Sequence, residues 1–169
     1  LIEKKVVIEG QKTAYFSEKF LEITVPVTTK EQIKEIKKTV THIAKKHDEE
    51  PYKALATTQQ AIFHQLEEQD EIDAAAIFDK VFEEKPLARQ AAQLAITEER
   101  VPEKIAVTNV PKYERKYSKQ KFKLDNGIEI TIPSEIYENK EMVEFINNPD
   151  GSVSVLIKNI ESILNKFNA

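Results

Sequence analysis

Apolar side chains recur every three or four residues through the middle of the chain, as they do along an amphipathic helix. The first run predicts a helix from Thr29, which has capping-box spacing with Gln32, to about Lys46. Its apolar positions are Ile33, Ile36, Val40, Ile43 and Ala44. A second helix is predicted from Pro51 to about Gln69, because proline is favoured in a first helical turn. Its apolar stripe is Tyr52, Leu55, Ala56, Ile62, Phe63 and Leu66.

Two shorter helices are predicted next. Asp73 is placed to cap the third helix, and Ile72 before this cap can pack on Ile77 after it, as in a hydrophobic staple. Pro86 predicts the start of a fourth, alanine-rich helix that reaches about Glu99. The middle of the chain is therefore expected to contain about four helices.

Towards the end of the chain the repeat changes from three or four residues to two, which is the repeat of a β-strand. Residues 121–124 and 128–132 alternate around Asp125-Asn126-Gly127 and predict a hairpin. A two-residue turn would mix the polar and apolar faces of this hairpin. A three-residue loop with Gly127 in the left-handed conformation keeps the faces separate. It pairs Leu124 with Ile128, Phe122 with Ile130 and Lys123 with Glu129.

A second hairpin is predicted between residues 143–146 and 152–158. Pro149 and Asp150 suit the centre of a type I turn, and Gly151 suits the position after them. Apolar residues occupy most of the returning strand, so we expect one buried face and a second, partly covered face. The two hairpins are expected to form a sheet of four antiparallel strands.

These elements predict an α+β fold in three parts. Residues 1–29 form an extended, strand-containing lead-in, with strand character at 5–10 and 20–27. Residues 30–110 form the helical region, and residues 111–169 form the antiparallel hairpin region, which ends in a short C-terminal helix. The chain starts at Leu1 and its only methionine is Met142, so we interpret it as a piece of a longer protein.

The composition removes several classes of function. The 169 residues include no cysteine, which excludes disulfides, thiolate nucleophiles and cysteine-ligated metals. No apolar run approaches the 18 residues that indicate a membrane-spanning helix. His42 and His47 are five residues apart and do not share a helix face as two metal ligands would, and no glycine-rich phosphate loop occurs. We therefore expect no catalytic residues, no metal and no cofactor.

Charge is distributed in blocks along this chain of net charge −4. Residues 112–123 hold six basic side chains and a single acid, interleaved with Tyr113, Tyr117 and Phe122. Cations can hold phosphates and aromatic rings can stack on bases, so this segment is a candidate nucleic-acid site. The alternative is that its lysines are the outward residues of an edge strand, and Phe122 suits a core position better than a stacking role. The candidate residues are Lys112, Arg115, Lys116, Lys119, Lys121 and Lys123.

A protein-interaction module is the other interpretation of the charge pattern. The first predicted helix carries six lysines, and residues 48–84 carry eleven acids and two lysines. The two surfaces could meet within one chain, which is the simpler interpretation, or across a dimer. The lysines are Lys30, Lys34, Lys37, Lys38, Lys45 and Lys46.

Three sequence segments near the C-terminus, and one near the start, resemble the bacterial nucleoid-associated protein family. They are Leu-Asp-Asn-Gly-Ile-Glu-Ile-Thr-Ile-Pro at 124–133, Val-Glu-Phe-Ile-Asn-Asn-Pro-Asp-Gly-Ser at 143–152, Ile-Lys-Asn-Ile at 157–160 and Tyr-Phe-Ser-Glu-Lys-Phe-Leu at 15–21. The resemblance spans nearly the whole chain and corresponds to the C-terminal half of a family member.

This resemblance implies a cytoplasmic protein of the bacterial nucleoid that contacts DNA, most simply double-stranded DNA, and is neither an enzyme nor a membrane protein. We therefore expect non-specific, phosphate-directed DNA binding. The alternative is an oligomerisation or protein-docking module, in which the chain contacts itself or other nucleoid proteins.

Overall fold

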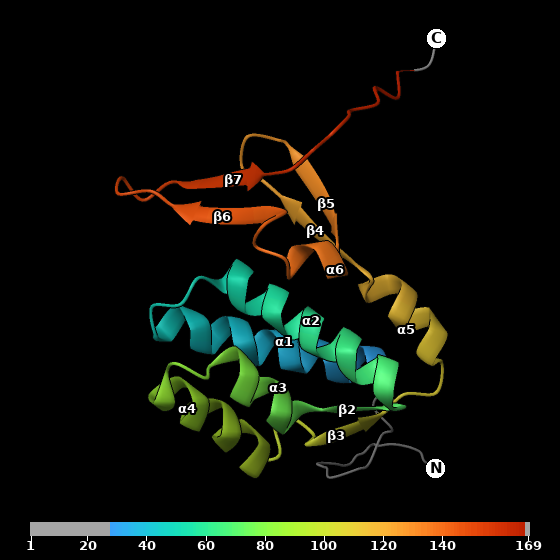
Figure 1. The fold of residues 1–169 in the computed structure, drawn as a ribbon. Helices are drawn as coiled ribbons and strands as arrows, with labels where there is room; N and C mark the ends of the chain where they lie inside the picture. Colours follow the sequence, from blue (N-terminus) through green and yellow to red (C-terminus); the bar gives the residue numbers. More distant parts are fainter. Residues whose placement is uncertain (1–27, 168–169) are drawn as a thin grey trace, which may run out of the picture. The chain divides into compact units, whose positions relative to one another are not determined.

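The computed structural model describes residues 28–167, and four helices account for the first part of this range (Figure 1). They are α1 (Thr29–Lys46), α2 (Pro51–Glu68), α3 (Ala74–Val81) and α4 (Pro86–Thr97). These bounds confirm the helices that the apolar repeat predicts, with α4 two residues shorter than expected. The strand segments predicted at 5–10 and 20–27 lie outside the described residues.

The helix starts follow from local hydrogen bonds. The capping box of α1 begins one residue earlier than predicted: Thr28 Oγ1 accepts from the N–H of Glu31 at 3.1 Å, and Glu31 Oε1 accepts from the N–H of Thr28 at 3.3 Å. A glutamate also interacts more favourably than glutamine with the positive end of the helix dipole. Asp73 caps α3 as predicted, because its carboxylate accepts from the N–H of Ala76 at 3.1 Å.

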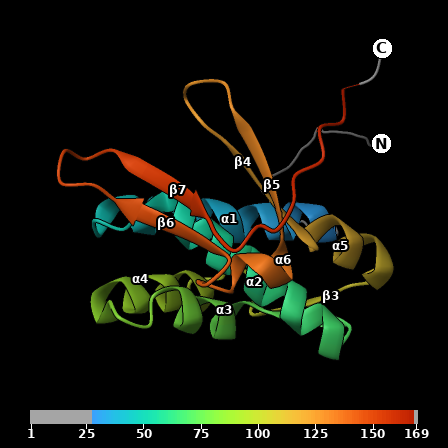
Figure 2. The ribbon, with the colours of Figure 1, turned by 45° about the horizontal axis from the view of Figure 1, so that its top comes forward.

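The hydrophobic core is built on the apolar faces of these helices. Ile36 and Val40 of α1 are fully buried, as are Phe78 of α3 and Phe82 just after it. Ile72 and Ile77, the expected staple pair, are fully buried as well. Burying a side chain of this size contributes about 1.5–3 kcal/mol. Within residues 33–167, α3 and α4 lie on one side of α1 and α2, and the hairpins lie on the other (Figures 1 and 2).

A small sheet inside the helical region was not predicted. Strand β2 (Glu71–Asp73) pairs antiparallel with β3 (Lys104–Ala106), and Ile72 lies opposite Ile105. Both isoleucines are buried, and the N–H of Val107 extends the ladder to the carbonyl of Asp70 at 3.0 Å. Three-residue strands are too short to display a repeat of two. The two strands are also about 30 residues apart in the sequence, so a local pattern cannot indicate that they pair.

The first C-terminal hairpin has the predicted register. Strands β4 (Lys119–Lys123) and β5 (Glu129–Pro133) pair Phe122 with Ile130 and Lys123 with Glu129. The N–H of Leu124 donates to the carbonyl of Ile128 at 2.8 Å, and Gly127 has φ +94°. The three-residue loop is therefore confirmed, together with its left-handed glycine.

Two helices flank this hairpin and were not predicted. Helix α5 (Val110–Tyr117) follows Asn109, whose side chain accepts from the N–H of Lys112 at 3.3 Å, and α6 (Ser134–Tyr137) follows β5. The Asn-Val-Pro sequence at 109–111, where α5 begins, is a usable start signal. The helix has only two turns, however, and Tyr113 is its one buried residue, so it shows no apolar stripe.

The second hairpin turns as predicted but packs differently. Strands β6 (Val143–Asn147) and β7 (Val153–Ile157) are joined by a turn in which Gly151, at φ +90°, donates to the carbonyl of Asn148 at 3.0 Å. Each hairpin is its own two-stranded sheet, which corrects the expected four-stranded sheet. Strand β7 has no buried face: Val153, Leu156 and Ile157 are 41–53% exposed. Residues 158–167 form no helix, contrary to prediction.

Buried amides attach the β4–β5 hairpin to α2. Gln120 Nε2 donates to the carbonyl of Ala56 at 2.9 Å and to Gln60 Oε1 at 3.1 Å, and Gln60 Nε2 donates to the carbonyl of Ser134 at 3.0 Å. Gln120, Gln60 and Ser134 are all buried. Gln59 adds a bond from Nε2 to the carbonyl of Lys119 at 2.8 Å. Helix α2 is therefore hydrogen-bonded both to β4, the first strand of the hairpin, and to Ser134, the residue directly after its second strand.

We predict that Gln120→Ala lowers the free energy of unfolding by about 1–3 kcal/mol, because it leaves Gln60 Oε1 buried without its donor. Urea unfolding of the chain measures this change. Thr131→Ala, at an exposed position of β5, is the matched control and should change the free energy by no more than about 0.5 kcal/mol. Equal effects for the two variants would contradict a role for the buried amides.

Candidate nucleic-acid interface

All six basic residues predicted to contact nucleic acid are exposed. They lie on two consecutive elements, helix α5 and strand β4, which are separated only by Ser118. We call these six residues the basic strip; Lys112, Arg115 and Lys116 belong to α5, and Lys119, Lys121 and Lys123 belong to β4.

The strand half of the basic strip follows from the alternation of exposed and packed side chains along β4. Lys119, Lys121 and Lys123 are exposed, whereas Gln120 is buried and Phe122 is partly buried. Alternate residues of a strand are about 7 Å apart, which corresponds to two phosphate steps along the axis of one DNA strand. This half of the strip therefore presents three ammonium groups in a row, as the sequence predicted.

The helix half of the basic strip lies beside two tyrosine rings. Lys112 Nζ is 5.4 Å from the centre of the Tyr113 ring, and Lys116 Nζ is 6.0 Å from that of Tyr117. Tyr113 is buried, and burial, with a smaller contribution from Tyr113, raises the pKa of Tyr117 to about 12. Both tyrosines are thus structural, which argues against the prediction that they stack on bases.

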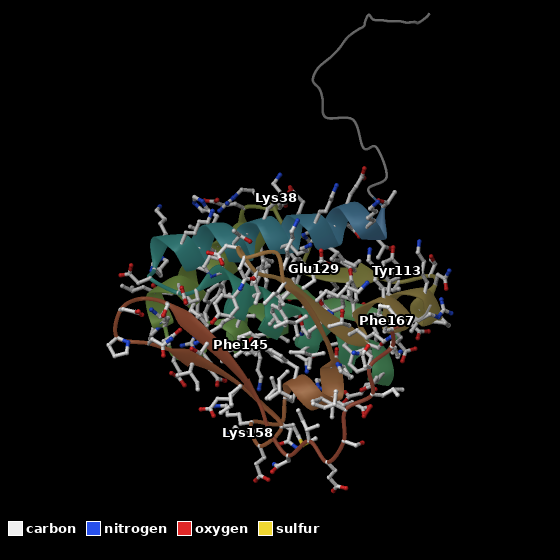
Figure 3. All side chains as sticks on the ribbon, turned by 90° about the horizontal axis from the view of Figure 1, so that it is seen from above. Lys38, Tyr113, Glu129, Phe145, Lys158 and Phe167 are labelled. Atoms are coloured by element: carbon white, nitrogen blue, oxygen red, sulfur yellow. The ribbon has the colours of Figure 1, made fainter. Side chains whose placement is uncertain are left out.

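Phe122 belongs to an aromatic cluster under the two hairpins. Its ring centre is 5.1 Å from that of Phe145 and 5.8 Å from that of Tyr137. Tyr52 of α2 joins the cluster at 5.7 Å from Phe145, which is labelled in Figure 3. Such ring pairs contribute about 0.5–1.5 kcal/mol beyond their buried area. The interpretation of Phe122 as a packing residue is confirmed.

The charges of the basic strip are uncompensated. Within residues 28–167, none of its six side chains forms an ion pair. The register places the exposed Glu129 across from Lys123, but their charged groups do not form a salt bridge in this part of the chain. The strip therefore keeps its positive charge available to an external anion.

The lysines of α1 do not pair with the acidic segment as the simpler interpretation expected. In the described part of the chain, the ion pair that α1 forms is internal, between Lys38 Nζ and Glu35 Oε2 at 3.3 Å. Acidic residues of this segment interact with other partners: Glu71 pairs with Lys104, and Asp79 accepts a hydrogen bond from Gln93. Charge pairing between these two segments is therefore not what packs α1 against its neighbours; the apolar face does so.

The described residues offer little chemistry of other kinds. They contain no group of three or more side chains placed to hold a metal ion. None of their helices is both long and apolar enough to cross a membrane. His42 is exposed and His47 is half-buried, and the two do not form a metal site in the described residues.

The comparison with known families decides what kind of protein carries this basic strip. The family model described as nucleoid-associated protein YejK matches residues 1–165. The chain belongs to this family. Membership confirms the resemblance seen in the sequence and gives the chain a role and a location in the bacterial nucleoid. The family is described by this association and not by a reaction. No curated protein and no solved structure matches the chain.

A histidine contact that the sequence did not indicate links the segment between the two hairpins to α2. His64 Nε2 is 2.8 Å from Glu138 Oε2, and His64 Nδ1 is 3.4 Å from Glu67 Oε1. Burial lowers the pKa of His64, but the hydrogen bonds and charges of Glu138 and Glu67 outweigh this effect and raise the pKa above 6.5. Glu138 follows α6 and is 74 residues from His64, so sequence spacing gives no signal for the pair.

We predict that His64 stabilises the fold at acidic pH. A histidine whose pKa is raised in the folded state contributes fully below its unfolded pKa of about 6.5, and the contribution is lost as pH rises through the folded pKa. The free energy of unfolding of the parent chain, minus that of His64→Gln, should therefore be larger at pH 5.5 than at pH 8.5. His42→Gln serves as the control, and NMR titration of the His64 ring gives the pKa directly. A difference independent of pH would contradict the prediction.

Proposed function

We propose that the basic strip binds the phosphate backbone of double-stranded DNA without sequence preference. The observation that carries this proposal is the line of six exposed, unpaired cations on α5 and β4, in a chain of the nucleoid-associated family. The hydrogen bonds from Gln120 to the carbonyl of Ala56 and from Gln59 to the carbonyl of Lys119 support it further, since they hold the strand half of the strip in place on α2 before DNA arrives.

Phosphate contacts position a protein on DNA, whereas base contacts give sequence preference. Lysine carries a compact point charge, which suits contacts with phosphates. The nearby rings of Tyr113, Tyr117 and Phe122 are committed to packing, so the strip lacks exposed stacking platforms. Binding is then driven by release of counterions from the DNA.

The acidic remainder of the chain restricts where DNA can bind. The net charge is −4 although the strip contributes six positive charges, so the rest of the chain has a net charge of −10 and, except near the exposed lysines of α1, repels phosphates. Repulsion between like charges orients the encounter and leaves the strip as the favoured point of contact. An acidic isoelectric point of about 5.6 is therefore compatible with a local DNA site.

We predict that log K for a short duplex falls with log salt at a slope of about −3 to −5, for roughly three to five neutralised phosphates. Replacing Lys119, Lys121 and Lys123 together by glutamine should make this slope less steep by about 3. Fluorescence anisotropy across a salt series measures both slopes, and reversal of the same three charges to glutamate should abolish binding.

The matched control replaces Lys45, Lys46 and Lys80 by glutamine, which removes the same charge from exposed positions outside the strip. This control should keep most of the parent slope. If the two triple variants lose affinity equally, the effect is one of net charge and the basic strip is not the site. Absence of binding by the folded parent chain at low salt would also reject the proposal.

Glu129→Lys should strengthen DNA binding and steepen the salt slope by about 1, because it replaces the acid opposite Lys123 with another cation. Glu103→Lys makes the same charge change at an exposed position just before β3, outside the basic strip, and should leave the slope near that of the parent chain. A similar gain in both variants would show that the position of the charge does not matter.

A further inference from the structure

A large apolar groove lies between the helices and the two C-terminal hairpins. Its volume is about 950 Å³, and its walls come from α1, α2, β4–β5 and β6–β7. The apolar side chains that line it include Leu55, Phe122, Ile128, Ile130, Val153 and Val155. Ile128 and Val153 are 53% and 41% exposed, so the groove presents apolar surface to water.

One polar group in the groove lacks a partner. The hydroxyl of Tyr52, which lines the groove, is buried and forms no hydrogen bond within the described residues. A buried hydroxyl without a partner costs about 1–3 kcal/mol. Burial, with a smaller contribution from Glu50, raises the pKa of Tyr52, so the hydroxyl keeps its proton and can donate. The lining of the groove is mainly apolar and suits an apolar occupant.

The segment after β7, residues 158–167, has the matching pattern. Its apolar residues occur at positions i, i+3, i+4 and i+7, the spacing of one helix face, and are 51–84% exposed. Phe167 is labelled on this segment in Figure 3. An isolated helix of this length is marginal in water, so an extended free form and a helical bound form are expected. The apolar residues are Ile160, Ile163, Leu164 and Phe167.

We call residues 158–167 the tail. Its first residues are hydrogen-bonded to the residues just before β6, at the end of β7 that is farther from the turn. The N–H of Lys158 donates to the carbonyl of Met142 at 2.8 Å, and Asn159, at φ +57°, donates from Nδ2 to the carbonyl of Glu141 at 2.8 Å. Lys158 Nζ also pairs with Glu144 Oε1 at 2.8 Å. From there the tail continues away from the helices (Figure 1).

None of residues 158–167 lines the groove of its own chain. Since this segment continues away from the helices that form one wall of the groove (Figure 1), its apolar face is available to another molecule.

We propose that the tail of one copy docks as a short amphipathic helix in the groove of a second copy, and that the exchange is reciprocal. The charges agree with this arrangement. Glu161 and Lys166 border opposite sides of the apolar stripe, and the residues that line the groove include Lys37 and Asp125, which lie outside the basic strip. Each charge of the tail therefore has a potential partner of opposite sign. A two-fold dimer buries both tails by the same contacts.

Cysteine cross-linking tests the exchange directly, because the chain contains no native cysteine. A copy carrying Leu164→Cys is mixed with a copy carrying Ile128→Cys under mild oxidation. The proposal expects a disulfide-linked heterodimer in good yield. Lys80→Cys, an exposed position on α3 outside the groove, is the matched control partner for Leu164→Cys and should give at least several-fold less product. Equal yields for both pairs would overturn the proposal.

A chain carrying both Leu164→Cys and Ile128→Cys separates exchange from folding back. Linked dimers support the exchange, whereas a disulfide within a monomer overturns it. Light scattering of the cysteine-free chain should give a mass that rises with concentration towards twice 19.4 kDa. Ile163→Asp with Leu164→Asp should return it to the monomer mass without changing urea unfolding of the monomer, because both side chains are 82–83% exposed. A parent chain that stays monomeric at all concentrations would overturn the proposal.

Discussion

The hydrogen bonds between α2 and the β4–β5 hairpin are the interaction on which the rest of the site depends. Gln59 and Gln60 are consecutive residues of α2, yet one bonds to the carbonyl of Lys119 where the hairpin begins and the other to that of Ser134 just after it ends. Gln120 completes the set from the strand side. Each such bond contributes about 1 kcal/mol net, but leaving one buried group unpaired costs more than forming the bond gains. The hairpin therefore has a single favoured position on the helix.

The same bonds explain how an acidic protein can hold a row of unpaired lysines. Lysines on a mobile segment would lose conformational freedom when they meet phosphates, which weakens binding. Here the strand backbone is ordered in advance, and only the lysine side chains remain to be fixed. Within residues 28–167 no acid forms an ion pair with the basic strip, although Glu114 lies on α5 and Glu129 lies opposite Lys123.

Local patterns in the sequence predicted α1–α4 and both hairpins, but they missed α5, α6 and the β2–β3 sheet, wrongly predicted a C-terminal helix and did not predict the assembly. The repeats gave the four helices, and the loop containing Gly127 gave the register of the first hairpin, because both depend on residues close in the chain. The exposed lysines of β4 followed from the same alternation. The β2–β3 sheet, the contact between His64 and Glu138 and the separation of the hairpins depend on residues 30 or more positions apart or on packing, which no local repeat records.

The exposed face of β7 is the clearest case of a pattern that was misinterpreted. Its apolar residues predicted burial, and the single chain leaves them in water. Apolar surface of this kind on a β-strand next to an apolar tail is costly in a monomer, and association is the usual way in which it is covered.

Strand β4 has one exposed face and one packed face. Lys119, Lys121 and Lys123 are exposed, while Gln120 and Phe122 face the helix and the aromatic cluster. A shift of the β4–β5 register by one residue would exchange the two faces of β4. The loop with the left-handed Gly127 sets this register, so it determines which side chains of β4 are exposed and which are packed.

If two copies exchange tails, they also join two basic strips. Linking two weak sites makes the second contact intramolecular, so the pair binds a long duplex far more tightly than either copy alone, without any new contact. Weak phosphate contacts then suffice for a protein of the nucleoid, where DNA is abundant and no particular sequence has to be found. The apolar groove and the cations share strand β4, and this sharing couples assembly to DNA binding within one structural unit.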